Sequence, residues 1–329
     1  MLTDSYGRTA TDLRVSLTDR CNLRCTYCMP PEGLDWLPKD DVLTDDEVAR
    51  LLRIGVTMLG ITEIRFTGGE PLLRRGLPGL IAAATELDPR PQTALTTNGI
   101  GLARVAPALA DAGLDRVNVS LDTLRHDVFE KLARRRRLDD VLAGMAAAAA
   151  AGLTPVKVNA VLMRGINDAE APDLLRYCLD HGYELRFIEQ MPLDAQHGWR
   201  RDDMVTADEI LDRLSAEFDL AETDAATRGS APAERFRVDG GPATVGVIGS
   251  VTRPFCGACD RVRLTADGQI RNCLFAREES DLRPLLRGGA TDDDIAARWR
   301  AAVAAKLPGH GINDPAFLQP SRPMSAIGG

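Results

Sequence analysis

The sequence predicts an α/β fold built around a parallel sheet, and three patterns support this prediction. Strand-like runs alternate with amphipathic or alanine-rich helical runs through residues 1–191, as in repeated βα units. The strands have one polar and one apolar face, and the unusual motifs fall where strands end. The six expected strands span residues 13–17, 63–66, 93–96, 116–121, 156–162 and 184–189.

The polarity of these strands favours a sheet curled into an incomplete barrel over a doubly wound one. Parallel strands that are covered on both faces read as almost continuously apolar. Four strands here have a polar face, formed by Arg14 and Ser16, Arg65 and Thr67, Asn118 and Ser120, and Lys157 and Asn159. A buried polar face is costly unless polar groups fill the space before it. We therefore expect a barrel whose interior holds a polar ligand, with a half-solvated sheet as the alternative.

The loop after the first strand carries three cysteines, Cys21, Cys25 and Cys28. Thiolate is the usual protein ligand of a [4Fe–4S] cluster, and three thiolates leave one iron open to a substrate or cofactor. Zinc normally takes four protein ligands in structural sites, and this loop offers three. The spacing predicts a cluster used for chemistry, with a zinc site or buried thiols as the alternatives.

Later strand ends also carry unusual residues. The second strand ends at Thr67-Gly68-Gly69-Glu70-Pro71, where paired glycines let the backbone approach a ligand closely and a carboxylate can accept a hydrogen bond from an ammonium. Three further motifs occupy residues 96–99, 120–122 and 189–192. Active sites of βα barrels are built at the carboxyl ends of their strands, so we expect these motifs to meet.

Residues 192–329 form a second region, in which the βα rhythm stops. Residues 221–243 suggest a loop or hairpin, and Asp267-Gly268 predicts a tight turn between two short strands. A second group of three cysteines, Cys256, Cys259 and Cys273, surrounds that hairpin. It is compatible with another cluster, or with zinc if His310 or an aspartate completes the site.

Composition narrows the class of protein. The net charge of −8 argues against broad binding to nucleic acid or an anionic membrane. No apolar run is long enough to span a bilayer, and no signal peptide is visible. Six of the seven cysteines fall in the two groups, which is ligand usage typical of a reducing cytoplasm. Cys178 is expected to be a core thiol, and residues 134–137 a solvated basic helix face.

The first cysteine loop, with Tyr27 before its last cysteine, and Gly68-Gly69-Glu70-Pro71 resemble the radical S-adenosylmethionine (SAM) superfamily. Further stretches resemble the GTP 3′,8-cyclase family of molybdenum-cofactor biosynthesis. They are residues 12–21, 64–74, 156–159, 185–192, 255–259, 261–264 and 324–329. Nearly the whole chain takes part in this resemblance.

The resemblance implies an incomplete six-stranded βα barrel over residues 1–191 and a C-terminal α+β extension over residues 192–329. It also implies one [4Fe–4S] cluster on each cysteine group, reductive cleavage of SAM, and attack of the GTP C3′ radical on guanine C8. The implied SAM contacts are Tyr27, Gly69, Ser120 and Met191. The implied GTP contacts are Arg14, Arg65, Thr96, Lys157, Arg261, Val262 and Arg263.

Two features refine what the resemblance implies. No GxxxxGK[ST] motif occurs, so the nucleotide is not expected to be held as in a P-loop protein. Asp260 stands where the family usually has asparagine, and a carboxylate there should weaken anion binding slightly. The terminal Gly328 and Gly329 are implied to reach the active site, against the ordinary alternative of a frayed chain end.

The implied partners are a reducing electron donor such as flavodoxin or ferredoxin, a downstream cyclic pyranopterin monophosphate synthase, and a second copy in a homodimer. Two alternatives remain open. A peptide-modifying radical enzyme with an auxiliary cluster predicts a peptide groove and no strand-borne cations. A non-catalytic iron–sulfur or zinc module leaves residues 67–71 and the polar strand face without a purpose.

Overall fold

The structure, a computed structural model, describes residues 1–224 and 228–328 of the chain. Within them, twelve strands form one hydrogen-bonded sheet. The strands are β1 (Asp12–Ser16), β2 (Glu63–Thr67), β3 (Gln92–Thr97), β4 (Arg116–Ser120), β5 (Lys157–Val161), β6 (Glu184–Ile188), β7 (Leu220–Glu222), β8 (Glu234–Val238), β9 (Thr244–Ile248), β10 (Arg261–Leu264), β11 (Gln269–Arg271) and β12 (Ser280–Asp281).

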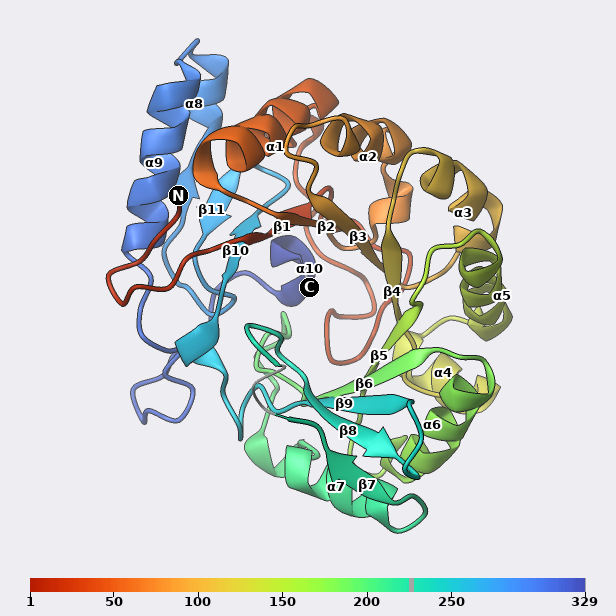
Figure 1. The fold of residues 1–329 in the computed structure, drawn as a ribbon. Coiled ribbons are helices and arrows are strands. Elements are labelled where there is room, and N and C mark those ends of the chain that lie inside the picture. Colours follow the sequence, from red (N-terminus) through yellow and green to blue (C-terminus); the bar gives the residue numbers. More distant parts are fainter. Residues whose placement is uncertain (225–227, 329) are drawn as a thin grey trace.

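Helices follow most of the parallel strands and cover the outside of the sheet (Figure 1). The α-helices of the described residues are α1 (Asp45–Leu59), α2 (Leu77–Thr85), α3 (Leu102–Asp111), α4 (His126–Ala133), α5 (Leu138–Ala150), α6 (Ala171–Asp180), α7 (Ala207–Ser215), α8 (Arg283–Arg287), α9 (Asp292–Ala304) and α10 (Met324–Ile327), and α10 does not belong to the outer layer. Among the described residues, no helix combines the length and apolar character needed to cross a bilayer.

The six expected strands are confirmed as β1–β6, each within one residue at either end. They lie side by side in sequence order and pair in parallel. Figure 1 shows that they curl into part of a ring, with α10 inside it. The expected curled sheet is therefore present.

The sheet is larger than the expected six strands, because the C-terminal region joins both of its edges. Strand β10 pairs in parallel with β1, and β9 pairs in parallel with β6. Antiparallel strands then extend each side, β11 and β12 beyond β10, and β8 and β7 beyond β9. In a six-stranded sheet, β1 and β6 would each leave a row of backbone groups unpaired, and the C-terminal strands satisfy those groups. The segment of residues 249–260, which we call the crossover, joins the two sides.

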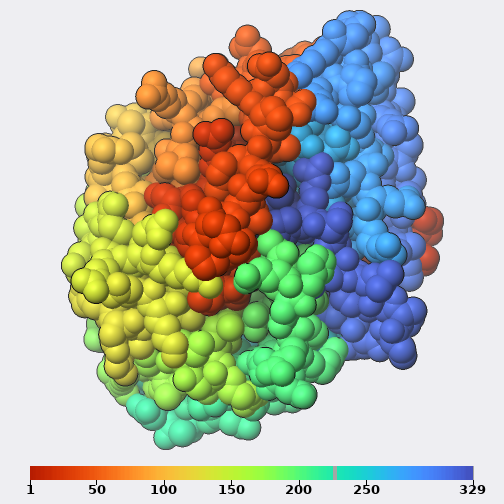
Figure 2. Space-filling view, turned by 180° about the vertical axis from the view of Figure 1, so that it is seen from behind, coloured from red at the N-terminus to blue at the C-terminus, as the bar shows by residue number. Residues whose placement is uncertain are grey.

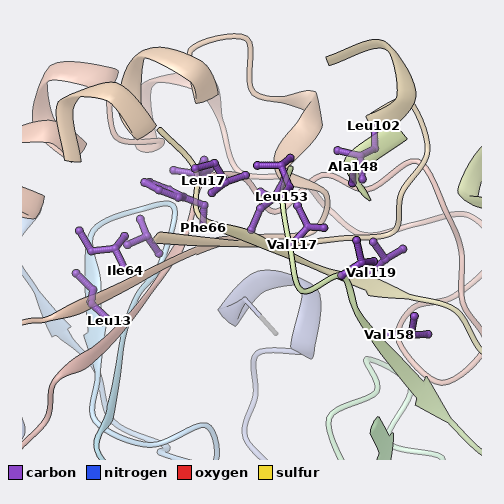
Figure 3. Packing of buried hydrophobic residues seen from close by; sticks show 14 of the residues in the cluster. Leu13, Leu17, Ile64, Phe66, Leu102, Val117, Val119, Ala148, Leu153 and Val158 are labelled. Carbon is purple, nitrogen blue, oxygen red and sulfur yellow. The ribbon is translucent and has the colours of Figure 1, made fainter. Parts of the chain in front are cut away.

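The apolar faces of the strands form the main core. Figure 3 shows Leu13, Ile64, Phe66 and Val117 on the face that packs against the helices, and all four are fully buried. Helix α5 packs closely against the start of α3. A Cβ at Gly144 would lie 3.1 Å from the Leu102 side chain and 2.6 Å from the carbonyl oxygen of Gly99, just before α3.

Local signals in the sequence explain several element boundaries. The Thr44 hydroxyl accepts a hydrogen bond from the Glu47 N–H at 3.2 Å, and the Glu47 carboxylate accepts one from the Thr44 N–H at 2.8 Å. This capping box begins α1. The predicted hairpin is present as the antiparallel pair β10–β11, with Gly268 at a φ of +82°. Cys178 is buried in the core as expected.

The polar faces of the strands point into the ring and lie in register. Arg14 is the neighbour of Arg65 on one side and of Arg263 on the other. Ser120 is aligned with Asn159, and Asn159 with Arg186.

Figure 2, seen from behind, shows the chain after β1 in red to orange, lying between the yellow-green helices and the blue C-terminal region.

Candidate active site

The first cysteine loop follows β1 and is fixed by the end of α4. The Arg24 N–H donates to the Ala133 carbonyl at 3.1 Å, and the Thr26 N–H donates to the Leu132 carbonyl at 2.9 Å. Arg134 then donates to the carbonyls of Arg24 and Met29 at 3.1 and 3.0 Å. The expectation of a solvated helix face at residues 134–137 is wrong for Arg134, because these residues form the turn between α4 and α5. The sequence offered no signal for this contact.

The three thiols of this loop are free, and Cys21 and Cys28 lie close enough to Cys25 to influence its pKa. Burial raises the pKa of Cys28 to about 12, and the neighbouring Cys21 acts in the same direction. Burial also raises the pKa of Cys25 well above its usual value, with Asp122 and the other two thiols contributing. A cationic metal centre would reverse this, because it stabilises thiolates. The donor set therefore fits a [4Fe–4S] cluster, whose irons are held by separate thiolates.

The glycines of residues 67–71 bring two loops together. Gly68 has a φ of +153°, and a Cβ there would lie 2.5 Å from the Thr18 carbonyl oxygen. The Gly69 N–H donates to that same oxygen at 2.7 Å, and the Glu70 N–H donates to the Arg20 carbonyl at 2.7 Å. Gly69 thus packs backbone to backbone beside the cysteine loop.

Glu70 is fully buried and is bonded within the chain. Its carboxylate accepts hydrogen bonds from the Thr97 hydroxyl at 2.7 Å, the Asn98 N–H at 2.7 Å and the Leu72 N–H at 3.0 Å. Burial raises its pKa to about 7, although these donors oppose the shift. The Asn98 amide donates in turn to Asn22 Oδ1 at 2.6 Å. Glu70 therefore positions the first cysteine loop through the end of β3.

A cavity of about 280 Å³ lies inside the ring, at the carboxyl ends of the strands. Most residues expected from the sequence line it. They are Tyr27, Ser120 and Met191 among the implied SAM contacts, Arg14, Arg65, Thr96, Arg261 and Arg263 among the implied GTP contacts, and Cys256, Cys259 and Cys273. The cavity also has apolar walls, including Phe255 and Phe275.

Lys157 and Val262 lie outside the set of lining residues. Lys157 pairs with Glu184 at 2.9 Å near the amino-terminal end of β5. Val262 is fully buried on the opposite face of β10 from Arg261 and Arg263, because neighbouring residues of a strand alternate between faces.

The lining guanidinium groups outnumber the carboxylates within 4 Å of them in the described structure. Buried nitrogens of Arg14, Arg65, Arg186 and Arg261 have no hydrogen-bond partner in the described structure. Asp12 lies 3.9 Å from Arg14 and 3.6 Å from Arg65. Glu63 pairs with Arg65 at 2.6 Å, and Asp260 lies 4.0 Å from Arg261. Burial, followed by repulsion from Arg65, holds the pKa of Arg14 well below its usual range. The surplus of buried positive charge therefore suits this cavity to binding a polyanion.

Arg186 belongs to this cation set, and sequence reasoning did not assign it. It lines the cavity, and its guanidinium donates to Asn118 Oδ1 at 2.9 Å. Burial and then Arg65 lower its pKa to about 9. The alternation that selected Arg14 and Arg65 also applies to β6, where Arg186 faces inward, so the signal was present.

The second cysteine group combines Cys256 and Cys259, on the crossover, with Cys273 after β11. Burial would raise the pKa of Cys259, but Arg261 and Lys306 together lower it to about 7. The Arg261 Nε and Lys306 Nζ lie 3.4 and 3.3 Å from its sulfur. These three free thiols also suit separate irons of a cluster.

Sequence analysis singled out two residues near this cysteine group, His310 and Asp260. His310 lines the cavity, accepts a hydrogen bond from the Ile312 N–H at 3.1 Å, and packs 5.1 Å from the Phe275 ring. Among the described residues, no three His, Cys, Asp or Glu side chains converge on a single-ion site. The Asp260 carboxylate accepts from the Thr11 hydroxyl at 3.3 Å and lies outside the lining set.

The chain end enters the ring through α10. The Gly328 carbonyl accepts a hydrogen bond from the buried guanidinium of Arg263. A Cβ at Gly328 would lie 2.8 Å from the Thr67 side chain, and the residue has a φ of +86°. Gly329 lies outside the described residues.

Comparisons with known proteins cover the whole chain. A family model of the radical SAM superfamily matches residues 15–178, and one for Molybdenum Cofactor Synthesis C matches residues 183–312. A GTP 3′,8-cyclase of Streptomyces coelicolor is 68% identical over 329 residues, which are 100% of this chain and 96% of that protein. One of Mycobacterium sp. (strain KMS) is 67% identical over 328 residues, covering 100% of this chain and 93% of that protein.

A solved structure supports the fold alone. Streptococcus suis SuiB bound to precursor peptide SuiA has a TM-score of 0.62 at 15% identity, over 97% of this chain and 76% of that chain. The two full-length relatives and the two family models lead to one conclusion: the chain belongs to the GTP 3′,8-cyclases of molybdenum cofactor synthesis, which are radical SAM enzymes.

Proposed function

We propose that the central cavity binds GTP against the second cysteine group and SAM against the first, and that the chain converts GTP to 3′,8-cyclo-7,8-dihydro-GTP. The observation that carries this proposal is the cation set of the cavity, Arg14, Arg65, Arg186, Arg261 and Arg263. Guanidinium groups pair bidentately with phosphate. They explain how a chain of net charge −8 can bind a highly anionic substrate.

The family implies SAM and a [4Fe–4S] cluster on Cys21, Cys25 and Cys28. When bound, the cluster would supply the electron that splits SAM to methionine and a 5′-deoxyadenosyl radical, which would take the 3′ hydrogen of GTP so that C3′ can bond to C8. One further electron, from the external donor, and one proton would then complete the 7,8-dihydro product. The chain then has to orient both molecules and exclude water. Tyr27, Ser120 and Met191 would hold SAM from the cavity lining, and Gly69 from its backbone.

On the GTP side, the arginines would bind the triphosphate, and Thr96 would contribute a hydroxyl to the same cavity. We propose that Lys157 and Val262 support the GTP site without lining the cavity. Lys157 pairs with Glu184, and Val262 packs in the core. The apolar rings of Phe255 and Phe275 would shield the reacting atoms from water.

The second cysteine group would hold a second [4Fe–4S] cluster, with one iron left open toward GTP. Cys256, Cys259 and Cys273 all line the cavity, which supports this assignment. Gly328 and Gly329 would form a tail that reaches the substrate. The bond from Arg263 to the Gly328 carbonyl supports this, because it holds the tail beside the proposed triphosphate site.

The proposed organisation also has consequences outside the cavity. Residues 1–191 would carry the SAM chemistry. Residues 192–329 would carry the second cluster and would bind the substrate together with Arg14, Arg65 and Arg186 of the first region. A one-electron donor such as flavodoxin or ferredoxin would reduce the first cluster in the cytoplasm. A cyclic pyranopterin monophosphate synthase would use the product, and a homodimer remains part of the proposal.

A peptide-modifying radical enzyme is the second candidate, because the same fold occurs in a protein solved with its precursor peptide. A shared fold carries no shared substrate. Five lining arginines, four of which have a buried nitrogen without a hydrogen-bond partner in the described structure, are poorly suited to an ordinary peptide, which lacks a triphosphate. We therefore favour GTP.

Anaerobic reconstitution tests the proposal. Two cubane clusters give about eight irons per chain, and GTP should be required for coupled formation of 5′-deoxyadenosine and the cyclised product. Stoichiometric binding of zinc without an iron–sulfur chromophore would exclude both the cyclase and the peptide-modifying radical enzyme. Formation of 5′-deoxyadenosine with a peptide and none with GTP would exclude the cyclase.

Two cysteine variants separate the roles of the two groups. Cys21→Ala should abolish SAM cleavage, because the first cluster loses a ligand. Cys273→Ala should keep some uncoupled SAM cleavage and lose cyclisation, because the second group holds substrate. Equal loss of SAM cleavage in both variants would contradict this division.

A further inference from the structure

A buried lysine lies against the second cysteine group. Lys306 follows α9 and is 4% exposed. Its ammonium donates to the Cys259 sulfur at 3.3 Å, to the Cys259 carbonyl at 3.2 Å and to the Arg261 carbonyl at 3.0 Å. An ammonium has three N–H donors, so the three contacts account for all of them.

None of these partners is a carboxylate. Two are neutral carbonyls, and no described Asp or Glu forms an ion pair with Lys306. A buried charge is costly unless an opposite charge is near it. The Cys259 sulfur is the one hydrogen-bond partner that can carry a negative charge, and it does so as a metal ligand.

The first cysteine group has different surroundings. Two neutral groups donate hydrogen bonds to the Cys21 sulfur: the Leu23 N–H at 3.4 Å and the Asn98 amide at 3.8 Å. Arg24 donates to the Cys21 carbonyl, at 2.7 Å, and to no thiol. A cation in direct contact with sulfur thus distinguishes the second group.

We propose that Lys306 is a positioning residue for the second cluster, one that holds the Cys259 sulfur in its liganding place and raises the reduction potential of that cluster. This inference depends on the proposed second cluster. Reduction adds one electron, taking a [4Fe–4S] cluster from the 2+ to the 1+ state, and so adds negative charge beside Lys306. A cation and an N–H···S hydrogen bond stabilise the reduced form, and such contacts are known to set cluster potentials.

The test compares Lys306→Met, which removes the charge, with Lys306→Arg, which keeps it. Lys131→Met, on the exposed surface of α4, is the matched control. Each reconstituted full-length protein is titrated anaerobically with dithionite and followed by electron paramagnetic resonance. The signal that SAM does not alter reports the second cluster, and the signal that SAM alters reports the first.

We expect Lys306→Met to shift the midpoint of the SAM-insensitive signal to more negative potential. Lys306→Arg should recover most of the wild-type value, Lys131→Met should match wild type, and the first cluster should keep its potential in all three. An unshifted midpoint in Lys306→Met would overturn the inference, as would equal shifts in the Met and Arg variants.

Folding and the existence of the second cluster are checked separately. Lys306→Gln keeps a hydrogen-bond donor without the charge, and an intact first-cluster signal reports a folded chain. A negative shift in this variant supports the charge effect if Lys306→Met cannot be purified. Wild-type protein with about four irons and no SAM-insensitive signal would overturn the second cluster and this inference together.

Discussion

Replacing Arg14 with methionine should stabilise the empty protein and weaken GTP binding. The Arg14 side chain is 13% exposed, its Nε has no partner, and its nearest carboxylate is 3.9 Å away. Burial and Arg65 depress its pKa, so the charged form is disfavoured in the folded state. Removing one partner of a buried ion pair is usually destabilising, but Asp12 keeps Arg65 at 3.6 Å when Arg14 is replaced. The change therefore removes a surplus positive charge, and we expect an effect like that of replacing a buried ion pair by apolar side chains, which is neutral or stabilising by up to about 4 kcal/mol.

The effect on binding has the opposite sign. A hydrogen bond to a charged group contributes about 1.5–3 kcal/mol, so its loss should weaken GTP binding roughly 10- to 150-fold. Ligand at one hundred times the wild-type dissociation constant raises the free energy of unfolding by about 2.7 kcal/mol. A variant bound about thirty-fold more weakly should gain only about 1 kcal/mol under the same conditions.

The assay is urea unfolding under anaerobic conditions, with and without GTP. Arg125→Met is the control, because the Arg125 side chain is 62% exposed and pairs with Asp127 at the surface; it should leave both quantities near wild type. The reasoning is refuted if Arg14→Met lowers the stability of the empty protein while leaving the GTP-induced gain unchanged.

Three further changes test other parts of the structure. The pKa of Glu70 is about 7 in the fold, above the ordinary 4.5, so the native state keeps a proton that the unfolded chain loses. Stability should fall by about 3 kcal/mol as pH rises through that window, and Glu70→Gln should flatten the fall in urea titrations; an equal slope would contradict it. Gly144→Ala should cost about 1–3 kcal/mol in thermal unfolding, because its Cβ would lie 2.6 Å from the Gly99 carbonyl. Gly79→Ala, which meets nothing within 4 Å, should gain about 0.5–1 kcal/mol; similar effects of the two would argue against close α3–α5 packing. Deleting residues 328–329 should abolish cyclisation at unchanged iron content, and wild-type turnover would disprove a role for the tail.

Strand existence and direction could be predicted because the relevant signals are local. Alternation of polar and apolar residues places Arg14 and Arg65 on one face whatever the partner strands are. The same rule applies to Arg186 and would have included it in the cation set. Arg186 was therefore predictable from the alternation of polar and apolar residues in β6.

The size of the sheet could not be predicted in the same way. Strands β9 and β10 pair with β6 and β1, which lie far away in sequence. Strand pairing over such distances depends on which edges remain free in the folded protein, and periodicity within a strand does not report that. The contacts of Arg134 and Lys306 were missed for a related reason, since each donates mainly to backbone carbonyls of distant segments.

The last third of the chain attaches to both edges of the sheet formed by β1–β6, and this has a consequence for biosynthesis. While the ribosome is still making the crossover, β6 can already pair with β9. Strand β1 still lacks its outer partner, because β10 follows the crossover in sequence. An unpaired strand edge is a template for pairing with other chains, and slowly completed sheets expose such edges for longer. A nascent chain that stops before residue 261 should therefore aggregate, and full-length synthesis should benefit from a chaperone that covers strand edges.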